Sequence, residues 1–284
     1  GAVRTHDPLH EIVTLADYRT RLGQYHTDPD LQDLHAHVPW ICTWDDHELA
    51  NDAWAGGAEN HQPHEGAWSD RKAAGSQAYF EWMPIRPDSL RDGGVLYRRL
   101  RWGALAELNM LDLRSYRSAS PSRFDGRAID QTGTMTGAEQ FDWLTRGLAS
   151  STARWNVIGN SVMVAPVLIP PLDDRTMGAL TDLLGLPREG ITYNADQWDG
   201  YAGERRRLFD VIRSTGNRNH VFLTGDIHTA WANEVPTDPA DYPGAGTGAV
   251  EFVTPSITSN NIDEMLSLPE GNGLSVAAQS ALMG

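Results

Sequence analysis

Four consecutive ionisable residues, Asp45-Asp46-His47-Glu48, follow the almost uncharged run Val38–Trp44. Carboxylate oxygens are the ligands that hard cations prefer, and imidazole binds borderline cations or transfers protons. The adjacent carboxylates repel one another, and a bound cation would offset that repulsion. The tetrad therefore predicts a metal site at the end of a buried strand. The alternative is a helix that begins at His47, with an aspartate as its N-cap and Glu48 in its first turn.

Polar residues also follow three further strand-like runs. They are Arg114 after Ala104–Leu111, Asn160 after Trp155–Ile158, and Asp226 with His228 after His220–Thr224. Ligands of α/β sheets bind at the carboxyl ends of strands, so we expect these residues and the tetrad to form one site. Asp226 and His228 are two residues apart, a spacing that points both side chains the same way in extended chain, as a two-metal site requires.

Each of these residues has a simpler interpretation when taken alone. Asn160 follows a glycine and is typical of a turn, and Asp226 with His228 can form an ordinary turn as well. Arg114 can be a salt-bridged surface residue, although the planar guanidinium also fits an oxyanion. The joint placement of these residues favours the single site.

Four helices are predicted to frame this site. Thr14–Asp17 and Thr136–Glu139 are capping-box patterns that predict two helix starts. The other two helices are expected over Ser69–Trp82 and over Glu204–Ser214, the latter ended by Gly216.

Helices alternate with the apolar runs named above and with a further run, Val250–Thr254. This alternation predicts an α/β fold with sheets covered by helices, built as a single domain over residues 1–284. Long segments at 55–67, 170–199 and 236–248 are expected to form the walls of the site.

The overall composition of the chain excludes some classes of function. The 284 residues are 40% hydrophobic and carry a net charge of −15, which argues against a protein that wraps nucleic acid. No apolar run reaches the length of a membrane span. The single cysteine, Cys42, excludes an internal disulfide, and nothing in the pattern indicates its role. The sequence starts at glycine without a signal-peptide pattern, so we expect it to be part of a longer product.

Six blocks of the sequence, in order, resemble the PhoD-type alkaline phosphatases and phosphodiesterases of the calcineurin-like metallophosphoesterase superfamily. They are WDDHELANDAWAGGAENH (44–61), LDLRSYR (111–117), ARWNVIGNSVMVAP (153–166), NADQWDGY (194–201), LTGDIHTAWANEV (223–235) and VEFVTPSITS (250–259). The resemblance implies two packed β-sheets flanked by helices, with calcium and iron at the strand ends. It implies hydrolysis of phosphate monoesters or diesters, including phospholipids, by a secreted or periplasmic monomer.

The resemblance also assigns residue roles. His47 and Arg114 would be catalytic residues that contact the phosphate, with Arg114, Asn160 and Trp198 binding substrate. Asp46, Asn160, Asp226 and His228 would bind metal. Asp45, Glu48 and Asn51 would orient these ligands.

The sequence departs from the family at both ends. A Gly-Asp-x-x-Tyr block with a metal-bridging aspartate, and a cysteine ligand before it, are not found, and the closing family segment is also missing. We therefore expect the fold to be incomplete at both ends. The alternative function is a catalytically inactive fragment or a cation-binding module. Abundant acids alone would also suit a paired-carboxylate glycosidase, which nothing else supports.

Overall fold

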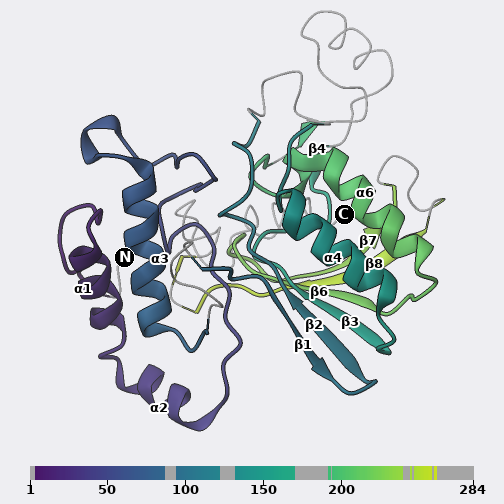
Figure 1. The fold of residues 1–284 in the computed structure, drawn as a ribbon, viewed down its shortest axis with the longest axis horizontal. Coiled ribbons are helices and arrows are strands. Elements are labelled where there is room, and N and C mark those ends of the chain that lie inside the picture. The colour runs from purple at the N-terminus through teal and green to yellow at the C-terminus, as the bar shows by residue number, and fades with distance from the viewer. Residues whose placement is uncertain are drawn as a thin grey trace, which may run out of the picture.

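The computed structural model describes residues 4–86, 94–121, 132–169, 191–192, 194–238, 244, 246–257 and 259–260. Figure 1 shows the helices of the N-terminal third on one side and a β-sheet with two further helices on the other. Much of the predicted walls at 170–199 and 236–248 lies outside the described residues. No helix within the described ranges is long and apolar enough to cross a membrane.

A six-stranded sheet has the order β1-β2-β3-β6-β8-β7. Its strands are β1 (Arg98–Trp102), β2 (Ala106–Met110), β3 (Trp155–Gly159), β6 (His220–Thr224), β8 (Thr247–Val253) and β7 (Trp231–Pro236). The four central strands run parallel, and β1 and β7 are antiparallel edge strands. A parallel sheet aligns the carboxyl ends of its strands, and this edge is where the polar residues were predicted to converge.

A second, small sheet pairs β4 (Leu168–Ile169) with β5 (Ile191–Thr192). The α/β class with flanking helices is confirmed. Where two packed sheets were predicted, the described strands form one large sheet and this two-stranded one.

The predicted helices are present. They are α1 (Leu15–Tyr25), α3 (Trp68–Trp82), α4 (Ala138–Ser150) and α6 (Ala202–Ser214), and the structure adds α2 (Pro29–His37) and the short 3-10 helices η1 (Pro63–Glu65) and η2 (Trp198–Tyr201). The capping box at Thr14 is confirmed, and Gly216 follows α6 with a φ of +69°. The capping box at Thr136 is wrong: Gly137 caps α4, because the Thr136 hydroxyl donates to Glu204 at 2.6 Å.

The predicted strand over Val38–Trp44 is also wrong. The segment has no strand assignment, and its side chains hold it in place instead. The indole N–H of Trp44 donates to Asp112 at 2.9 Å, and the Thr43 hydroxyl donates to the Leu111 carbonyl at 2.6 Å. Cys42 and Trp44 are buried, so the residues directly before the acidic tetrad are still anchored in the core.

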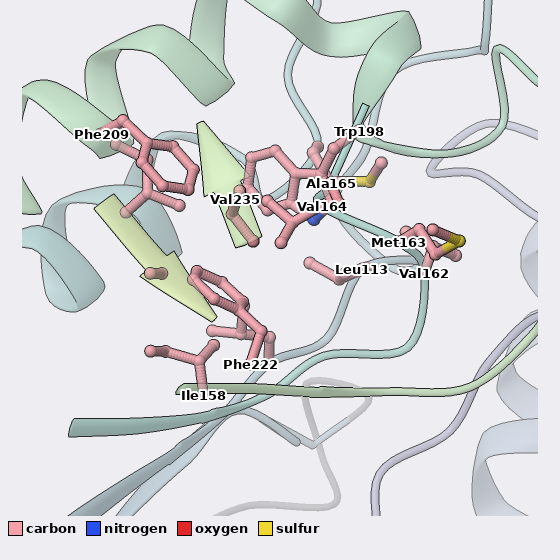
Figure 2. Packing of buried hydrophobic residues seen from close by; sticks show 14 of the residues in the cluster. Leu113, Ile158, Val162, Met163, Val164, Ala165, Trp198, Phe209, Phe222 and Val235 are labelled. Atoms are coloured by element: carbon pink, nitrogen blue, oxygen red, sulfur yellow. The ribbon is translucent and has the colours of Figure 1, made fainter. Parts of the chain in front are cut away.

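Helices α4 and α6 cover one face of the sheet (Figure 1) and enclose the main core. Figure 2 shows this core, in which Phe209 of α6 stacks on Phe222 of β6 with ring centroids 6.2 Å apart. Burial of such side chains contributes about 1.5–3 kcal/mol each. The core thus fixes β3 and β6 as a rigid base below the loops that follow them.

A row of buried polar side chains crosses the same face at the amino ends of the strands. Glu107, Asn156 and His220 are register partners on β2, β3 and β6 and are at most 5% exposed. Among the residues that the structure describes, the amide of Asn156 and both ring nitrogens of His220 have no hydrogen-bond partner. Burial lowers the pKa of His220, against a smaller opposing effect of the Asn217 backbone, so the ring is neutral at pH 7.

Candidate active site

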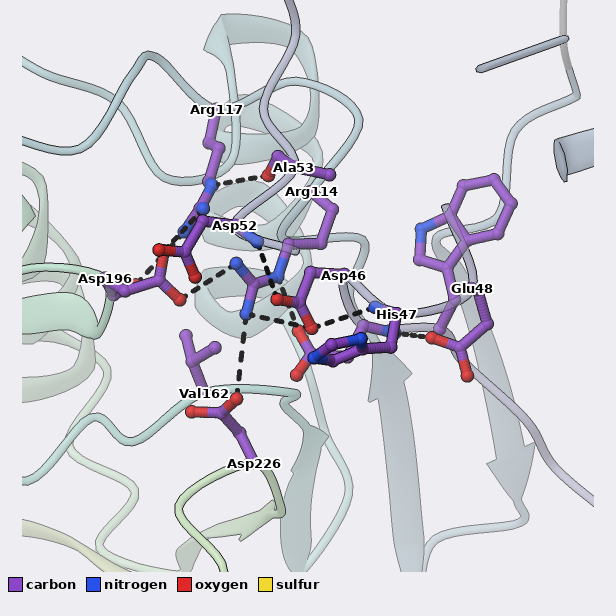
Figure 3. Close-up of polar contacts among 12 residues, drawn as sticks. Asp46, His47, Glu48, Asp52, Ala53, Arg114, Arg117, Val162, Asp196 and Asp226 are labelled. Atoms are coloured by element: carbon purple, nitrogen blue, oxygen red, sulfur yellow. Dashed lines mark hydrogen bonds and ion pairs between the residues drawn. The ribbon is translucent and has the colours of Figure 1, made fainter. Parts of the chain in front are cut away.

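Side chains from four separate segments meet above the carboxyl edge of the sheet. They come from the loop 45–52, from the turn after β2, from the segment before η2 and from the loop after β6. Figure 3 shows the guanidinium of Arg114 among Asp46, Asp196 and Asp226. We call the set Asp45, Asp46, Asp52, Arg114, Arg117, Asp196 and Asp226 the acidic cluster.

Arg114 lies at the centre of the acidic cluster and is fully buried. Its Nε donates to Asp45 at 2.5 Å, and its Nη1 lies 2.9 Å from an Asp196 oxygen. Its Nη2 lies 3.9 Å from Asp46 and 3.8 Å from Asp226. Neither Nη1 nor Nη2 has hydrogen-bond geometry with these oxygens. The guanidinium is therefore held by ion pairs while its terminal N–H groups remain able to donate.

The turn that presents Arg114 is organised by Asp112. One carboxylate oxygen of Asp112 accepts from the backbone N–H groups of Arg114 at 3.1 Å and Ser115 at 2.9 Å, as well as from Trp44. This is the local pattern by which aspartate stabilises a turn. Asp112 thus fixes the direction of the arginine and joins that turn to the segment that carries the tetrad.

Asp196 was missed by the sequence reasoning. It lies in the block NADQWDGY, and its carboxylate bridges Arg114 at 2.9 Å and Arg117 at 2.5 Å. Arg117 is itself fully buried and also donates to the Ala53 carbonyl at 2.9 Å. The two arginines were readable from the sequence, but nothing local indicates that their shared carboxylate lies about eighty positions further along the chain.

The tetrad forms a turn, so the alternative of a helix N-cap at Asp45 or Asp46 is wrong. Asp46 accepts from the backbone N–H of His47 at 2.9 Å and of Asp52 at 2.8 Å. Glu48 accepts from the backbone N–H of Asp45 at 2.8 Å. The side chains of Asp46 and Glu48 therefore shape the loop, while His47 is exposed.

The backbone is left-handed at three non-glycine residues around the cluster. These are Asp52 (φ +51°), Asp226 (φ +71°) and His228 (φ +59°). Such conformations cost on the order of 1–3 kcal/mol and concentrate at functional sites. Asp226 is further held by the amide of Gln197, which donates to its second oxygen.

Carboxylate pKa values diverge within the cluster. Burial alone would raise the pKa of Asp46, but Arg114, His47 and backbone N–H groups lower it below the ordinary value. Burial, with the charge of Asp46, raises the pKa of Asp45 despite Arg114. Burial and the charge of Asp45 raise the pKa of Asp226 to about 8. At pH 7 and without a bound cation, the Asp226 carboxyl is therefore protonated in most of the protein molecules.

Two further acids show the same excess of negative charge. Burial, followed by the charges of Asp196 and Asp46, raises the pKa of Asp52 to about 6. Burial also raises the pKa of Glu48. The two arginines thus do not neutralise the surrounding carboxylates, which leaves charge for a cation to neutralise.

One group of ligand atoms within the cluster could hold a metal ion. Oxygens of Asp45, Asp46 and Asp226 all lie within 4.8 Å of one another. The donors are all carboxylate oxygens, which suits a hard cation such as calcium. The raised pKa of Asp226 also fits, since a cation at this place would displace its proton.

The remaining predicted site residues form their hydrogen bonds with groups outside the acidic cluster. Asn160 follows β3, but its side chain is buried and bonded to Val162, Thr224 and the indole of Trp198. Trp198 is fully buried in the core, and its indole N–H donates to the Asn160 side chain at 3.1 Å.

The last two predicted residues, His228 and Asn51, also form their hydrogen bonds with groups outside the acidic cluster. His228 pairs through Nδ1 with the Asn260 carbonyl at 2.6 Å and does not join the three aspartates. Asn51, predicted to orient ligands, instead donates to Glu59 at 2.5 Å.

Comparisons with known proteins agree with this architecture. A solved structure described as "Structure of PhoD" superposes with a TM-score of 0.79 at 35% sequence identity, covering 90% of this chain and 47% of that one. Alkaline phosphatase D of Bacillus subtilis (strain 168) is 39% identical over 267 residues, which are 91% of this chain and 42% of the relative. The chain therefore spans less than half the length of both relatives. The family model of the PhoD-like phosphatases matches residues 1–282, and the chain belongs to this family.

Proposed function

We propose that this chain carries the phosphate-binding and cation-binding site of a phosphoric ester hydrolase. The observation that supports it most is the buried guanidinium of Arg114 beside three clustered aspartates: its two terminal nitrogens make no hydrogen bond to any residue that the structure describes. Arginine in this state is a ready donor pair for a phosphoryl group. Membership of the PhoD-like phosphatase family and similarity to alkaline phosphatase D support the same reaction class.

Charge balance explains why phosphate and cations would bind together. The aspartates repel a phosphoryl group, and Arg114 alone does not outweigh them. Cations held by Asp45, Asp46 and Asp226 would neutralise phosphoryl charge and lower the pKa of a bound water. Calcium matches these oxygen donors, and iron is proposed from family membership alone.

His47 is the residue best placed to serve the leaving group. It directly follows Asp46, its side chain is exposed, and it makes no side-chain hydrogen bond to any described residue. When water attacks phosphorus, the bond to the ester oxygen breaks and that oxygen needs a proton. The His47 imidazole would supply it, while Arg114 holds the non-bridging oxygens.

Removing Asp226 tests the proposal directly. Asp226→Asn keeps the shape of the side chain and removes one carboxylate from the proposed cation site. We expect kcat for 4-nitrophenyl phosphate and for bis(4-nitrophenyl) phosphate to fall at least a hundredfold, with loss of calcium-induced thermal stabilisation. Asp210→Asn is the control, since Asp210 is exposed on α6 and forms an exposed ion pair with Arg213. Full activity and unchanged calcium response in Asp226→Asn would disprove the proposal.

A cation-binding module without turnover is the second candidate. The carboxylate group of Asp45, Asp46 and Asp226 favours it, because that group could bind a cation without any further residue. Stoichiometric calcium binding by titration calorimetry, with no hydrolysis of either ester, would establish this alternative.

Substrate preference and cellular context are also proposals. We propose monoesters or diesters as substrates, with phospholipids among the diesters, and a secreted or periplasmic monomer. Comparing the rates on the two nitrophenyl esters and on phosphatidylcholine vesicles ranks the substrates. Light scattering measures the mass in solution, and cell fractionation locates the protein.

A further inference from the structure

The side chain of Gln197 links two loops at the carboxyl edge of the sheet and is 3% exposed. Its Oε1 accepts from the backbone N–H of Met163, which lies in the loop after β3. Its Nε2 donates to Oδ2 of Asp226, which lies in the loop after β6. Because a backbone N–H can only donate, the oxygen of the amide faces Met163 and its nitrogen faces the carboxylate. Gln197 therefore joins one carboxylate of the proposed cation site to the buried backbone of a neighbouring loop.

Gln197 is itself held by a compact turn over residues 194–200. The backbone N–H of Trp198 donates to the Met163 carbonyl at 3.1 Å, so the two segments are joined in both directions. The N–H of Gly200 donates to the Gln197 carbonyl at 3.1 Å, and a Cβ at Gly200 would lie 2.0 Å from the Ala195 carbonyl oxygen. The turn is therefore packed too closely for a side chain at Gly200, and the amide of Gln197 donates from a rigid support.

The amide restrains Asp226 beside a buried positive charge. The Oδ1 of Asp226 lies 3.8 Å from Nη2 of Arg114, the contact drawn as a dashed line in Figure 3, and that nitrogen makes no hydrogen bond to any described residue. Oxygens of Asp45 and Asp196 lie closer to the same guanidinium, at 2.5 and 2.9 Å. A carboxylate that is free to rotate would form the same kind of direct bond, because charge-assisted hydrogen bonds are the stronger ones. The bond from Gln197 to the other oxygen of Asp226 opposes that rotation.

We propose that Gln197 is a positioning residue that keeps the Asp226 carboxylate at the cation site and apart from the Arg114 guanidinium. The inference rests on the proposed function and deepens it, since cation binding uses an oxygen of Asp226 and phosphate binding uses the free N–H groups of Arg114. Without the amide, Asp226 rotates toward Arg114, so the cation loses a ligand and the guanidinium loses a free donor.

Gln197→Met tests this role, because methionine keeps the length of the side chain and removes the amide. We expect the calcium dissociation constant of the full chain, measured by titration calorimetry without phosphate, to rise about tenfold, as when a partner that orients a metal ligand is lost. Europium serves as a luminescent probe of the same oxygen ligands, and its decay rates in light and heavy water count the water molecules on the ion. About one more water should be bound in the variant, in the place of the Asp226 oxygen.

The matched control is Asn109→Leu. Asn109 is a fully buried amide on β2 that accepts from Arg99 at 2.5 Å, outside the acidic cluster. Its removal should change the calcium dissociation constant by less than about twofold and leave the number of bound waters unchanged. If Gln197→Met does not fold, Gln197→Asn replaces it with the same expectation, because its amide is one methylene too short to reach both partners.

The number of bound waters separates positioning from mere support of the fold. Weaker calcium binding with an unchanged number of waters would show a structural role and overturn the inference, as would an unchanged dissociation constant. Hydrolysis of 4-nitrophenyl phosphate by the unaltered protein is measured separately. No hydrolysis, with both expected changes in Gln197→Met, would reject the proposed function and leave the positioning role intact. Hydrolysis, with unchanged calcium binding in the variant, would reject the positioning role alone.

Discussion

Arg114→Ala is the change that most directly tests how the acidic cluster is held together. Arg114 is fully buried and lies 2.5 Å from Asp45 and 2.9 Å from Asp196. Asp196 keeps its contact with Arg117 at 2.5 Å after the change. Asp45 loses its only basic partner among the described residues and stays beside Asp46. Arg114→Ala therefore mainly removes the positive charge that offsets the repulsion among Asp45, Asp46 and Asp226.

The expected magnitude follows from this geometry. Two charges 4 Å apart interact by about 4 kcal/mol at an effective dielectric constant of 20. Arg114 has four carboxylate contacts closer than 4 Å, and two of them lie at 2.5 and 2.9 Å. Desolvation offsets much of the attraction, and removing one partner of a buried pair costs about 3–5 kcal/mol. We expect this loss in the free energy of unfolding at pH 7.5 with EDTA. It should shrink at pH 5, where the aspartates left without Arg114 take up protons in the folded state.

Urea denaturation followed by tryptophan fluorescence measures this loss at both pH values. Arg213→Ala is the matched control, because its pair with Asp210 is exposed and should contribute less than about 0.5 kcal/mol. Calcium at millimolar concentration should restore part of the loss by taking the place of the missing charge. A loss under about 1 kcal/mol for Arg114→Ala, equal at both pH values and unaffected by calcium, would refute the electrostatic account of the cluster.

Three further variants test other parts of the structure. Because the pKa of Asp226 is raised to about 8, its protonated form stabilises the cation-free protein fully below pH 4 and this stability is lost as the pH rises to about 8. Asp226→Asn should flatten that dependence and gain up to about 5 kcal/mol at pH 8 in urea titrations with EDTA, since each pKa unit corresponds to about 1.4 kcal/mol; an unchanged slope would contradict the shift. Glu251 is fully buried and accepts four hydrogen bonds, two of them from the backbone at 164 and 165. Glu251→Gln should therefore lower the free energy of unfolding by about 2–4 kcal/mol in the same assay. A loss under about 0.5 kcal/mol would show that the amide is accommodated. His220→Leu removes a buried ring whose nitrogens have no hydrogen-bond partner among the described residues, so it should leave the melting temperature unchanged or raise it. A fall of several degrees would mean that internal water satisfies the ring.

Elements governed by local patterns were readable from the sequence. The strand β6 and helix α6 match their predicted bounds within two residues, because apolar runs and a terminating glycine act over short distances. The segment Val38–Trp44 has the same apolar composition, yet hydrogen bonds from Trp44 and Thr43 hold it outside the sheet. Whether a run becomes a strand depends on a partner strand, which composition does not specify.

The candidate site was readable in part, for a similar reason. Arg114 and Asp226 follow the parallel strands β2 and β6, so the sheet topology brings these two residues together. Asp46 joins them because the segment before it is anchored to the turn after β2 by Trp44 and Thr43. Asp196 lies in an irregular segment whose path is set by tertiary contacts with Arg117, and no spacing rule identifies it. Trp198 looked like a pocket residue because the sequence places it in a long irregular segment, but in the structure it begins η2 and its indole N–H donates to the buried Asn160. Loop residues are placed by such nonlocal bonds.

The acidic cluster destabilises the folded protein in several ways, and bound ligands would relieve all of them. Asp226 combines a left-handed backbone with a raised pKa, and Arg114 is buried with two nitrogens that make no hydrogen bond. Apolar residues of similar volume would be as stable or more so, so stability alone does not account for this arrangement. A cation among the aspartates would remove their repulsion and release the guanidinium, and an oxyanion would then satisfy its free N–H groups. Each ligand therefore favours the other, and thermodynamic linkage requires the coupling to be equal in both directions.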